Sequence, residues 1–196
     1  INLVYKYIGK VAFRRGLQNY LKKHAYSNAE TRDLWAAWSE ASDKDVMAFM
    51  KTWTEVPGFP ILKASSSGDK LEVTQDRFFL NPSHEEDETC WPVPLMRSAA
   101  DTEVLEQKSA EFDTASKLNS GQSGFYRVIY SGKLKKDIYT DLEIGNISPL
   151  DALGILTDAS EAAKAGYHST TEVFEIMKYI ASTTSESLMS AALGEI

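Results

Sequence analysis

Apolar positions follow a helical period up to residue 53 and a shorter, alternating period afterwards. One stripe within residues 46–53 has the i, i+3, i+4, i+7 spacing of a helix face: Val46, Phe49, Met50 and Trp53. Pro57 and Pro60 follow this stripe, and neither residue can continue a helix. The sequence therefore predicts that a helical layer ends at Trp53 and that a β unit begins near Ile61.

Two further helices are predicted before this stripe. Residues 3–24 keep helical spacing, with Lys and Arg between the apolar positions, and Gly9 is expected to break the helix. Thr31 is the expected N-cap of the second helix, with Asp33 in its first turn. Ser42 and Asp45 stand three residues apart and predict a capping box at the start of the third helix.

Short alternating segments between residues 61 and 130 predict strands. The expected strands are residues 61–64, residues 71–73 with 78–80 as an extension, and residues 90–96, 102–107, 111–118 and 125–130. A turn at residues 65–69 and an acidic loop at residues 81–89 separate the first of them. Pro92 and Pro94 place their strand at a sheet edge. Turns at this spacing indicate a small β-sandwich.

The helical period returns after residue 131. Ser148, Pro149 and Asp151 give a helix-start signal, with Ser at the N-cap and Pro at the first helical position, and Gly166 is the expected terminator. Ser169 begins a similar signal for the next helix, and a last helix is expected from near residue 185. Helices joined by short loops are typical of α-solenoids. The predicted fold class is therefore multidomain α and β: a helical segment, then a small β-sandwich, then the start of an α-superhelical repeat domain.

Composition and charge narrow the function classes. The 196 residues are 43% hydrophobic and 25% charged, which is ordinary for a soluble globular protein. We expect no membrane association, because no apolar run approaches the about 20 residues of a membrane span. The net charge of -7 argues against nucleic-acid binding. Before Glu30 the chain has six basic residues and no acidic one: Lys6, Lys10, Arg14, Arg15, Lys22 and Lys23. They offer a basic face for an acidic partner, but a solvated helix face is the favoured interpretation.

Both ends of the sequence lie within predicted helices, and the first residue is Ile1 rather than Met. Both ends are therefore expected to be cut points in a larger protein. A single cysteine, Cys90, excludes an internal disulfide and indicates a reducing compartment, so a cytoplasmic location is expected.

Residues able to carry out chemistry are sparse. The three histidines, His24, His84 and His168, are far apart in the sequence. The segment that starts at His84 begins like the zinc motif His-Glu-x-x-His, but Glu88 stands where the second histidine is needed. Its carboxylates leave a calcium site as an alternative to a solvated acidic loop, which is preferred. Cys90 lacks a histidine at a diagnostic spacing. We therefore predict no catalytic, cofactor-binding or metal-ligating residue in this chain.

Three motifs stand in order within the first 60 residues. The first, G-L-x-x-Y-L, comprises Gly16, Leu17, Tyr20 and Leu21. The second, N-x-x-T-x-D-L-W, comprises Asn28, Thr31, Asp33, Leu34 and Trp35. The third, W-T-x-x-x-G-F-P, comprises Trp53, Thr54, Gly58, Phe59 and Pro60. Together they resemble the end of the catalytic domain of gluzincin zinc aminopeptidases, of the puromycin-sensitive and aminopeptidase N type.

Later segments extend this resemblance in family order. The segment EEDETCWPVPL, residues 85–95, is similar to the family's acidic loop and the strand after it. The segment LNSGQSGFYRVIY, residues 118–130, resembles its L-N-x-x-x-x-G-F-Y-R-V-x-Y motif. Residues 147–166 resemble the opening of its C-terminal helical domain.

The resemblance implies a layout and a missing active site. Residues 1–58 would be the last helices of a thermolysin-like catalytic domain, residues 59–131 a β-sandwich, and residues 132–196 the first helices of a superhelical domain. The family's zinc-binding His-Glu-x-x-His, its G-A-M-E-N stretch and its catalytic tyrosine have no counterpart here. Tyr5 and Tyr7 do not qualify, because they lie in the helix that follows that tyrosine.

Two hypotheses follow. In the first, the chain is a non-catalytic scaffold piece of a zinc aminopeptidase, which holds its zinc elsewhere and removes N-terminal residues from peptides. This chain alone would bind no zinc and would be inactive. In the second, the chain is a stand-alone protein-binding module, with self-association through exposed apolar faces at its cut ends.

Overall fold

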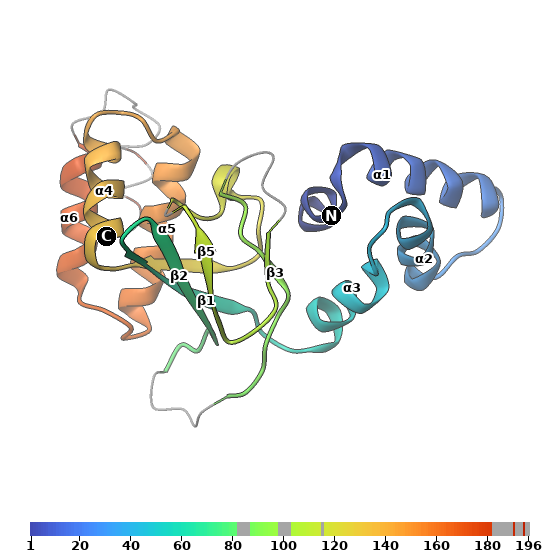
Figure 1. The fold of residues 1–196 in the computed structure, drawn as a ribbon, viewed down its shortest axis with the longest axis horizontal. Helices are drawn as coiled ribbons and strands as arrows, with labels where there is room; N and C mark the ends of the chain where they lie inside the picture. Colours follow the sequence, from blue (N-terminus) through green and yellow to red (C-terminus); the bar gives the residue numbers. More distant parts are fainter. Residues whose placement is uncertain (82–86, 98–102, 115, 182–189, 191–193, 195–196) are drawn as a thin grey trace.

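The computed structural model describes residues 1–81, 87–97, 103–114, 116–181, 190 and 194. The α-helices are α1 (Asn2–Lys23), α2 (Thr31–Ala41), α3 (Val46–Glu55), α4 (Gly132–Glu143), α5 (Pro149–Lys164) and α6 (Thr170–Ile180). The strands are β1 (Pro60–Ser67), β2 (Lys70–Arg77), β3 (Val93–Pro94), β4 (Val104–Leu105), β5 (Ser109–Asp113) and β6 (Arg127–Tyr130). One 3-10 turn, η1 (Ser120–Gln122), precedes β6. Helices α1–α3 lie at one end, the sheets in the middle and α4–α6 at the other end (Figure 1), so the mixed α and β composition is as predicted.

Helices α1–α3 pack around the predicted apolar stripe. Val46 is fully buried and Phe49 is 4% exposed. The ring of Tyr7 stacks on Phe49 at 4.0 Å between centroids. The predicted break is present, because Gly9 has a φ of 81° within α1. Gly16 lets α2 approach closely, since a Cβ atom there would lie 2.5 Å from Cδ1 of Trp38.

Two predicted helix caps are wrong by one and three positions. Glu30, not Thr31, is the N-cap of α2, and the carboxylate of Asp33 accepts the Glu30 backbone N–H at 2.8 Å. Asp45, not Ser42, caps α3 by accepting the Ala48 N–H at 2.9 Å. Asp and Ser are equally good N-caps, so residue type alone does not choose between neighbouring candidates.

The larger sheet has four strands in the order β5-β2-β1-β6, and β3 and β4 form a separate pair. β1 and β2 form an antiparallel hairpin around Gly68 and Asp69, but β6 pairs with β1 in parallel, with Leu62 opposite Val128. The predicted strands at residues 90–96 and 102–107 shrink to the two-residue strands β3 and β4, because Pro92 and Pro94 have no N–H to donate. The strand predicted at 111–118 is Ser109–Asp113, and residues 78–80 are not a strand.

A buried glutamine joins the two sheets. Gln75 of β2 is 1% exposed, and its Nε2 donates to the carbonyl oxygens of Trp91 and Gln107, both at 2.9 Å. Its Oε1 accepts the Trp91 backbone N–H at 2.9 Å. The apolar residues Leu71 and Val73 of the same strand share one core with Trp91. The β3–β4 pair is therefore fixed to the larger sheet by both apolar and polar contacts.

The C-terminal helices begin where the sequence predicts. The Oγ of Ser148 accepts the Asp151 N–H at 3.2 Å and caps α5, while Gly166 has a φ of 81° just beyond its end. Ser169 caps α6 by accepting the Thr171 N–H at 3.3 Å. The start of the helix expected near residue 185 lies outside the described residues. Among the helices that are described, none combines the length and the apolar character needed to cross a membrane.

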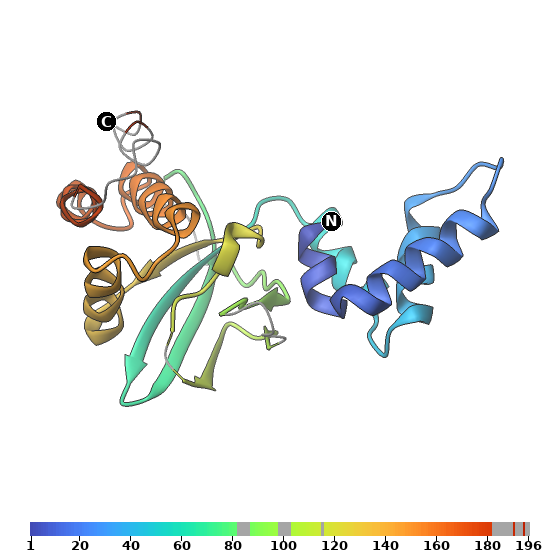
Figure 2. The ribbon, with the colours of Figure 1, turned by 90° about the horizontal axis from the view of Figure 1, so that it is seen from above.

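α5 lies beside β6, the edge strand of the larger sheet, in both ribbon views (Figures 1 and 2). An edge strand has unpaired N–H and C=O groups on its outer side, and these need partners when they are buried. The Asp158 side chain of α5 supplies a partner for one of them, the Val128 N–H. This contact fixes the position of the C-terminal helices relative to the sheet.

Candidate functional site at the seam between sheet and helices

The residues that were considered and rejected as metal ligands do not come together where the structure describes them. His24 follows α1 and His168 precedes α6, and these helices lie at opposite ends of the chain (Figure 1). His84 is outside the described residues. The thiol of Cys90 donates to the Glu106 carbonyl oxygen at 3.4 Å. Across the parts of the chain that are described, no group of three or more His, Cys, Asp or Glu side chains is arranged to hold a metal. The described members of this set, His24, Cys90 and His168, do not fit a zinc ion.

Two further candidates from the sequence are the acidic loop at residues 81–89 and the basic helix α1. Most of the loop is outside the described residues, but Asp87 forms an ion pair with Nε of Arg77 at 2.8 Å. This carboxylate is therefore already engaged with a cation of the protein. The basic residues of α1 are exposed except Lys6, which is half-buried.

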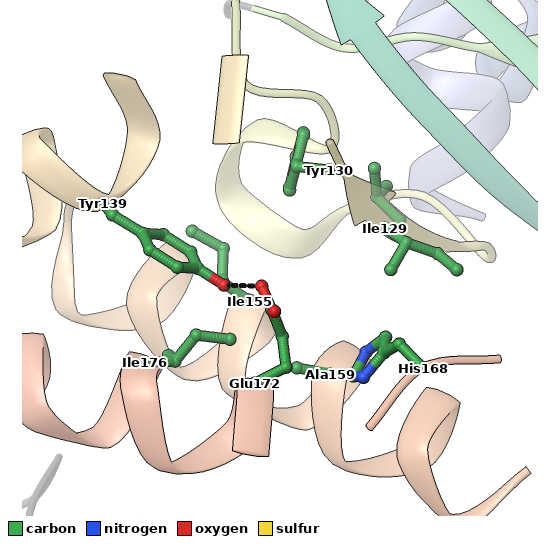
Figure 3. Close-up of a pocket in the computed structure, with 9 residues that line it drawn as sticks. Ile129, Tyr130, Tyr139, Ile155, Ala159, His168, Glu172 and Ile176 are labelled. Carbon is green, nitrogen blue, oxygen red and sulfur yellow. Dashed lines mark hydrogen bonds between the residues drawn. The ribbon is translucent and has the colours of Figure 1, made fainter. Parts of the chain in front are cut away.

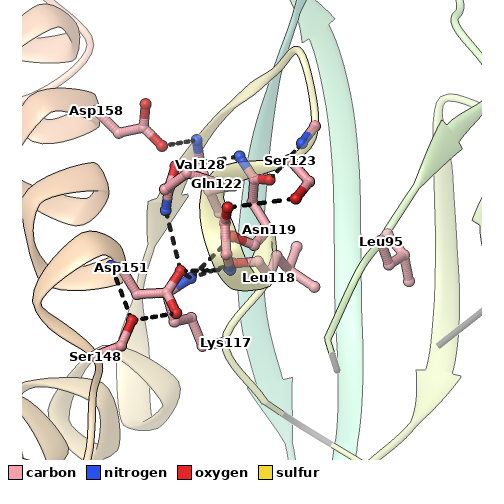
Figure 4. Close-up of polar contacts among 12 residues, drawn as sticks. Leu95, Lys117, Leu118, Asn119, Gln122, Ser123, Val128, Ser148, Asp151 and Asp158 are labelled. Carbon is pink, nitrogen blue, oxygen red and sulfur yellow. Dashed lines mark hydrogen bonds and ion pairs between the residues drawn. The ribbon is translucent and has the colours of Figure 1, made fainter. Parts of the chain in front are cut away.

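The described polar side chains do converge at a contact that we call the seam: residues 117–128 and the face of α5 that they touch. One end of the seam is centred on Asp151 (Figure 4). Its Oδ1 accepts from Nζ of Lys117 at 2.9 Å and from the Gly121 N–H at 2.8 Å. Its Oδ2 accepts from the hydroxyl of Ser148 at 2.9 Å. Burial alone would raise the pKa of Asp151, but these donors hold that pKa below its ordinary value.

Asp158 forms the other end of the seam, two turns further along α5. Its Oδ2 accepts the backbone N–H of Val128 at 3.0 Å, and its Oδ1 lies 3.3 Å from Nη1 of Arg127. Burial raises the pKa of Asp158 to about 7, which outweighs the Val128 N–H, Arg127 and Lys117. The carboxyl group thus covers the outer edge of β6.

Arg127 connects the seam to the start of the sheet. Its Nη2 lies 3.4 Å from Oε2 of Glu161, so two carboxylates of α5 share one guanidinium. The guanidinium carbon also lies 5.7 Å from the ring centroid of Phe59 and 5.2 Å from that of Phe78. Phe59 precedes β1 and Phe78 follows β2, so both rings lie at the open end of the β1–β2 hairpin. The Arg127 guanidinium therefore links β6 to α5 and to the open end of this hairpin.

A glycine gives the seam its close packing. At Gly154 of α5, a Cβ atom would lie 2.0 Å from Cδ of Gln122. The amide of Gln122 accepts from Nδ2 of Asn119 at 3.3 Å and donates to Asp151 at 3.4 Å. The missing side chain therefore makes room for the η1 turn against the helix.

A small recess lies beside the seam, between β6, α4, α5 and α6 (Figure 3). Inside it, the hydroxyl of Tyr139 donates to Glu172, which also accepts from Nζ of Lys135 at 3.0 Å. Burial, followed by the Glu172 carboxylate, raises the pKa of the Tyr139 phenol. The recess has about 20 Å³ of space, which suits a single water molecule. It is too small for a peptide or a cofactor.

Known proteins match this chain along most of its length. Residues 1–53 match the family described as Peptidase family M1 domain, and residues 116–196 match the family described as ERAP1-like C-terminal domain. The puromycin-sensitive aminopeptidase of Caenorhabditis elegans is 35% identical over 188 residues, which covers 87% of this chain and 20% of that relative. Aminopeptidase N of Lactococcus lactis is 32% identical over 207 residues, which covers 100% of this chain and 24% of that relative. The chain belongs to the M1 aminopeptidase family.

Archaeal proteins are also similar to this M1 family chain. The Tricorn protease-interacting factor F2 of Thermoplasma volcanium is 34% identical over 180 residues, which covers 91% of this chain and 22% of that relative. The chain spans between 20% and 24% of the length of these three relatives. The resemblance drawn from the sequence motifs is thereby confirmed at the level of the family.

Sequence analysis missed the residues that form the seam. Asp151 was identified only as a helix-start residue, Arg127 only as a fixed position of the motif at residues 118–130, and Asp158 and Gln75 were not singled out. Signals for two of them were present. Asp158 stands seven positions after Asp151, on the same helix face, within an otherwise apolar stripe. Gln75 continues the inward alternation of Leu71 and Val73.

Proposed function

We propose that this chain is a non-catalytic scaffold piece of a zinc-dependent aminopeptidase that removes N-terminal residues from peptides. The observation that carries the proposal is the order of the two family matches, catalytic-type at residues 1–53 and C-terminal-type at residues 116–196. The names of the relatives, which include puromycin-sensitive aminopeptidase and aminopeptidase N, support the activity. Zinc and the peptide substrate would then be bound by other parts of the parent protein, and no residue of this chain has a catalytic or metal-binding role.

The proposed layout has three parts: residues 1–58 belong to the catalytic domain, residues 59–131 form a β-sandwich, and residues 132–196 begin the superhelical domain. The shared core of β2 and the Trp91 segment supports two facing sheets. The three successive helices α4–α6 support the start of a helical repeat. A cytoplasmic location remains a prediction from the single cysteine.

The seam gives the scaffold role structural support. Lys117, Arg127 and the backbone of Gly121 and Val128 are all bound to carboxylates of α5. Buried polar contacts of this kind fix one relative orientation, because each unsatisfied partner costs about 1–3 kcal/mol. In the parent, the seam would hold the first C-terminal helices at a set angle to the sheet.

The test is direct. The purified chain is incubated with Zn²⁺, desalted, and examined for retained zinc by mass spectrometry and for hydrolysis of aminoacyl p-nitroanilides. We expect no retained zinc and no turnover, with full-length aminopeptidase N of Lactococcus lactis as the active comparison. Zinc-dependent turnover by the 196-residue chain would refute the scaffold role. Coding sequence for His-Glu-x-x-His upstream of Ile1 would support it.

Exposed apolar side chains favour a second candidate, a stand-alone module that binds a partner or itself. Val11 is 82% exposed, Leu21 is 59% exposed and Phe174 is 60% exposed. Light scattering after size-exclusion chromatography separates the candidates. A concentration-dependent dimer that the double variant Val11→Ser and Phe174→Ser abolishes favours the module, and a monomer favours the scaffold.

A further inference from the structure

We propose that the seam between β6 and α5 is a proton-sensitive latch, in which the buried Asp158 carboxyl group gains a proton as the pH falls and the helix then holds the sheet edge more tightly. The latch is a conformational device within this chain, and it does not depend on the proposed parent activity.

The argument starts from a comparison within one helix. Asp151 and Asp158 are each 8% exposed and lie seven residues apart on α5. Asp151 receives three donors at 2.8–2.9 Å, from Lys117, Gly121 and Ser148. A carboxylate with that many short bonds remains ionised even when it is buried. The surroundings of Asp151 therefore compensate its charge.

Asp158 lacks equal compensation. Its contact with Nη1 of Arg127 is 3.3 Å, whereas charge-assisted N–H···O bonds are typically about 2.7–2.9 Å. The same guanidinium is shared with Glu161 at 3.4 Å and with the rings of Phe59 and Phe78. An ion pair that is long and shared with a second carboxylate does not offset the free energy of burying the Asp158 charge. The neutral acid is therefore the better fit to this site.

Protonation preserves the hydrogen bond to the sheet. A neutral carboxylic acid still has an acceptor oxygen for the Val128 N–H, which faces away from β1 on the outer edge of β6. Arg127 keeps Glu161 and both aromatic rings as partners. Protonation therefore removes the uncompensated charge of Asp158 and keeps its hydrogen bond to Val128. The seam is tighter in the protonated state.

The direction of the pH effect follows from linkage. The folded chain holds the Asp158 proton at a pKa of about 7, against an ordinary value of 3.8. A group whose pKa is raised on folding stabilises the fold at low pH, and this stabilisation is lost as the pH rises through the folded pKa. Between pH 6 and pH 8, the unfolding equilibrium constant should rise about tenfold from this group alone.

Several charged or titratable groups surround Asp158: Arg127 and Tyr130 from β6, Lys117 from the segment before η1, Asp151 and Glu161 from α5, and Lys135, Tyr139, His168 and Glu172 around the neighbouring recess. Histidine is the side chain that ordinarily changes charge near neutral pH. The experiment is therefore done in a His168→Gln background, which removes the one imidazole next to the seam among the residues described.

The test measures urea unfolding of the whole chain at pH 6 and pH 8, for the His168→Gln background and for the same background with Asp158→Asn. From pH 6 to pH 8, the unfolding equilibrium constant of the background should rise about tenfold. That of the asparagine variant should rise clearly less. The matched control is Asp151→Asn, which should weaken folding at both pH values and leave the pH response in place.

A direct titration keeps the proposal falsifiable if the asparagine variant does not fold. The ¹³C chemical shift of the Asp158 carboxyl group, assigned by NMR in the folded chain, should titrate with a midpoint near 7. The Val128 amide should exchange more slowly at pH 6 than at pH 8 after correction for intrinsic rates. A midpoint below about 5, or a tenfold pH response that survives Asp158→Asn, would overturn the latch.

Discussion

Replacing Gln75 with leucine tests how the two sheets are held together. Leucine has nearly the same volume, so the substitution removes polar atoms with little loss of packing. It leaves three groups without their partner: the buried Trp91 N–H and Trp91 carbonyl, and the part-buried Gln107 carbonyl. Each of the two buried groups costs about 1–3 kcal/mol when it is unsatisfied, and the added apolar surface returns about 1.5 kcal/mol, so the net loss is centred on about 2.5 kcal/mol.

A loss of this size is large against a typical domain stability of about 5–15 kcal/mol. Urea unfolding followed by tryptophan fluorescence measures it, because the Trp91 side chain is fully buried. The control is Gln107→Leu, the same substitution at an exposed side chain whose backbone carbonyl is retained; it should change stability by less than about 0.5 kcal/mol. Equal effects of the two variants would show that the glutamine does not join the sheets.

Three further substitutions test other contacts. Gly16→Ala should destabilise the α1–α2 packing by about 1–2 kcal/mol in thermal unfolding, because the new methyl group meets Trp38 and outweighs the gain in helix propensity. Ser148→Ala should cost about 1–2 kcal/mol, more than Ser169→Ala, because Ser148 also donates to Asp151; equal losses would contradict the seam geometry. Trp53→Phe should cost about 1 kcal/mol by removing the indole bond to the Pro92 carbonyl, measured by chemical denaturation.

Local signals in the sequence located most of the helices. Ser148 and Ser169 cap the helices that they predict, and Gly9 and Gly166 have the positive φ angles expected at a break and a terminus. These features depend on a few neighbouring residues and the backbone conformation that they favour, so they can be recognised from the sequence alone. The choice between Glu30 and Thr31 was missed because Thr is a preferred N-cap residue and Glu is not, whereas the contact at this cap is made by the Glu30 backbone N–H to Asp33.

The sheet order and the seam depend on contacts between distant residues. No local pattern indicates that β6 pairs in parallel with β1, since a short strand carries no information about its partner. The pairing of Asp158 with Arg127 crosses from a helix to a strand in the same way. Sequence periodicity placed Asp158 among buried positions, but only the fold shows which donors face it and how far away they are.

The parallel pairing of β1 with β6 has a consequence during synthesis. Ile61 pairs with Arg127, so the first strand leaves the ribosome well before its neighbour exists. At about 5–20 residues per second, the hairpin of β1 and β2 waits on the order of several seconds with one side of β1 uncovered. An uncovered strand edge recruits other strands. Until residue 130 has left the ribosome, this uncovered edge of the nascent chain is therefore open to chaperones and to aggregation.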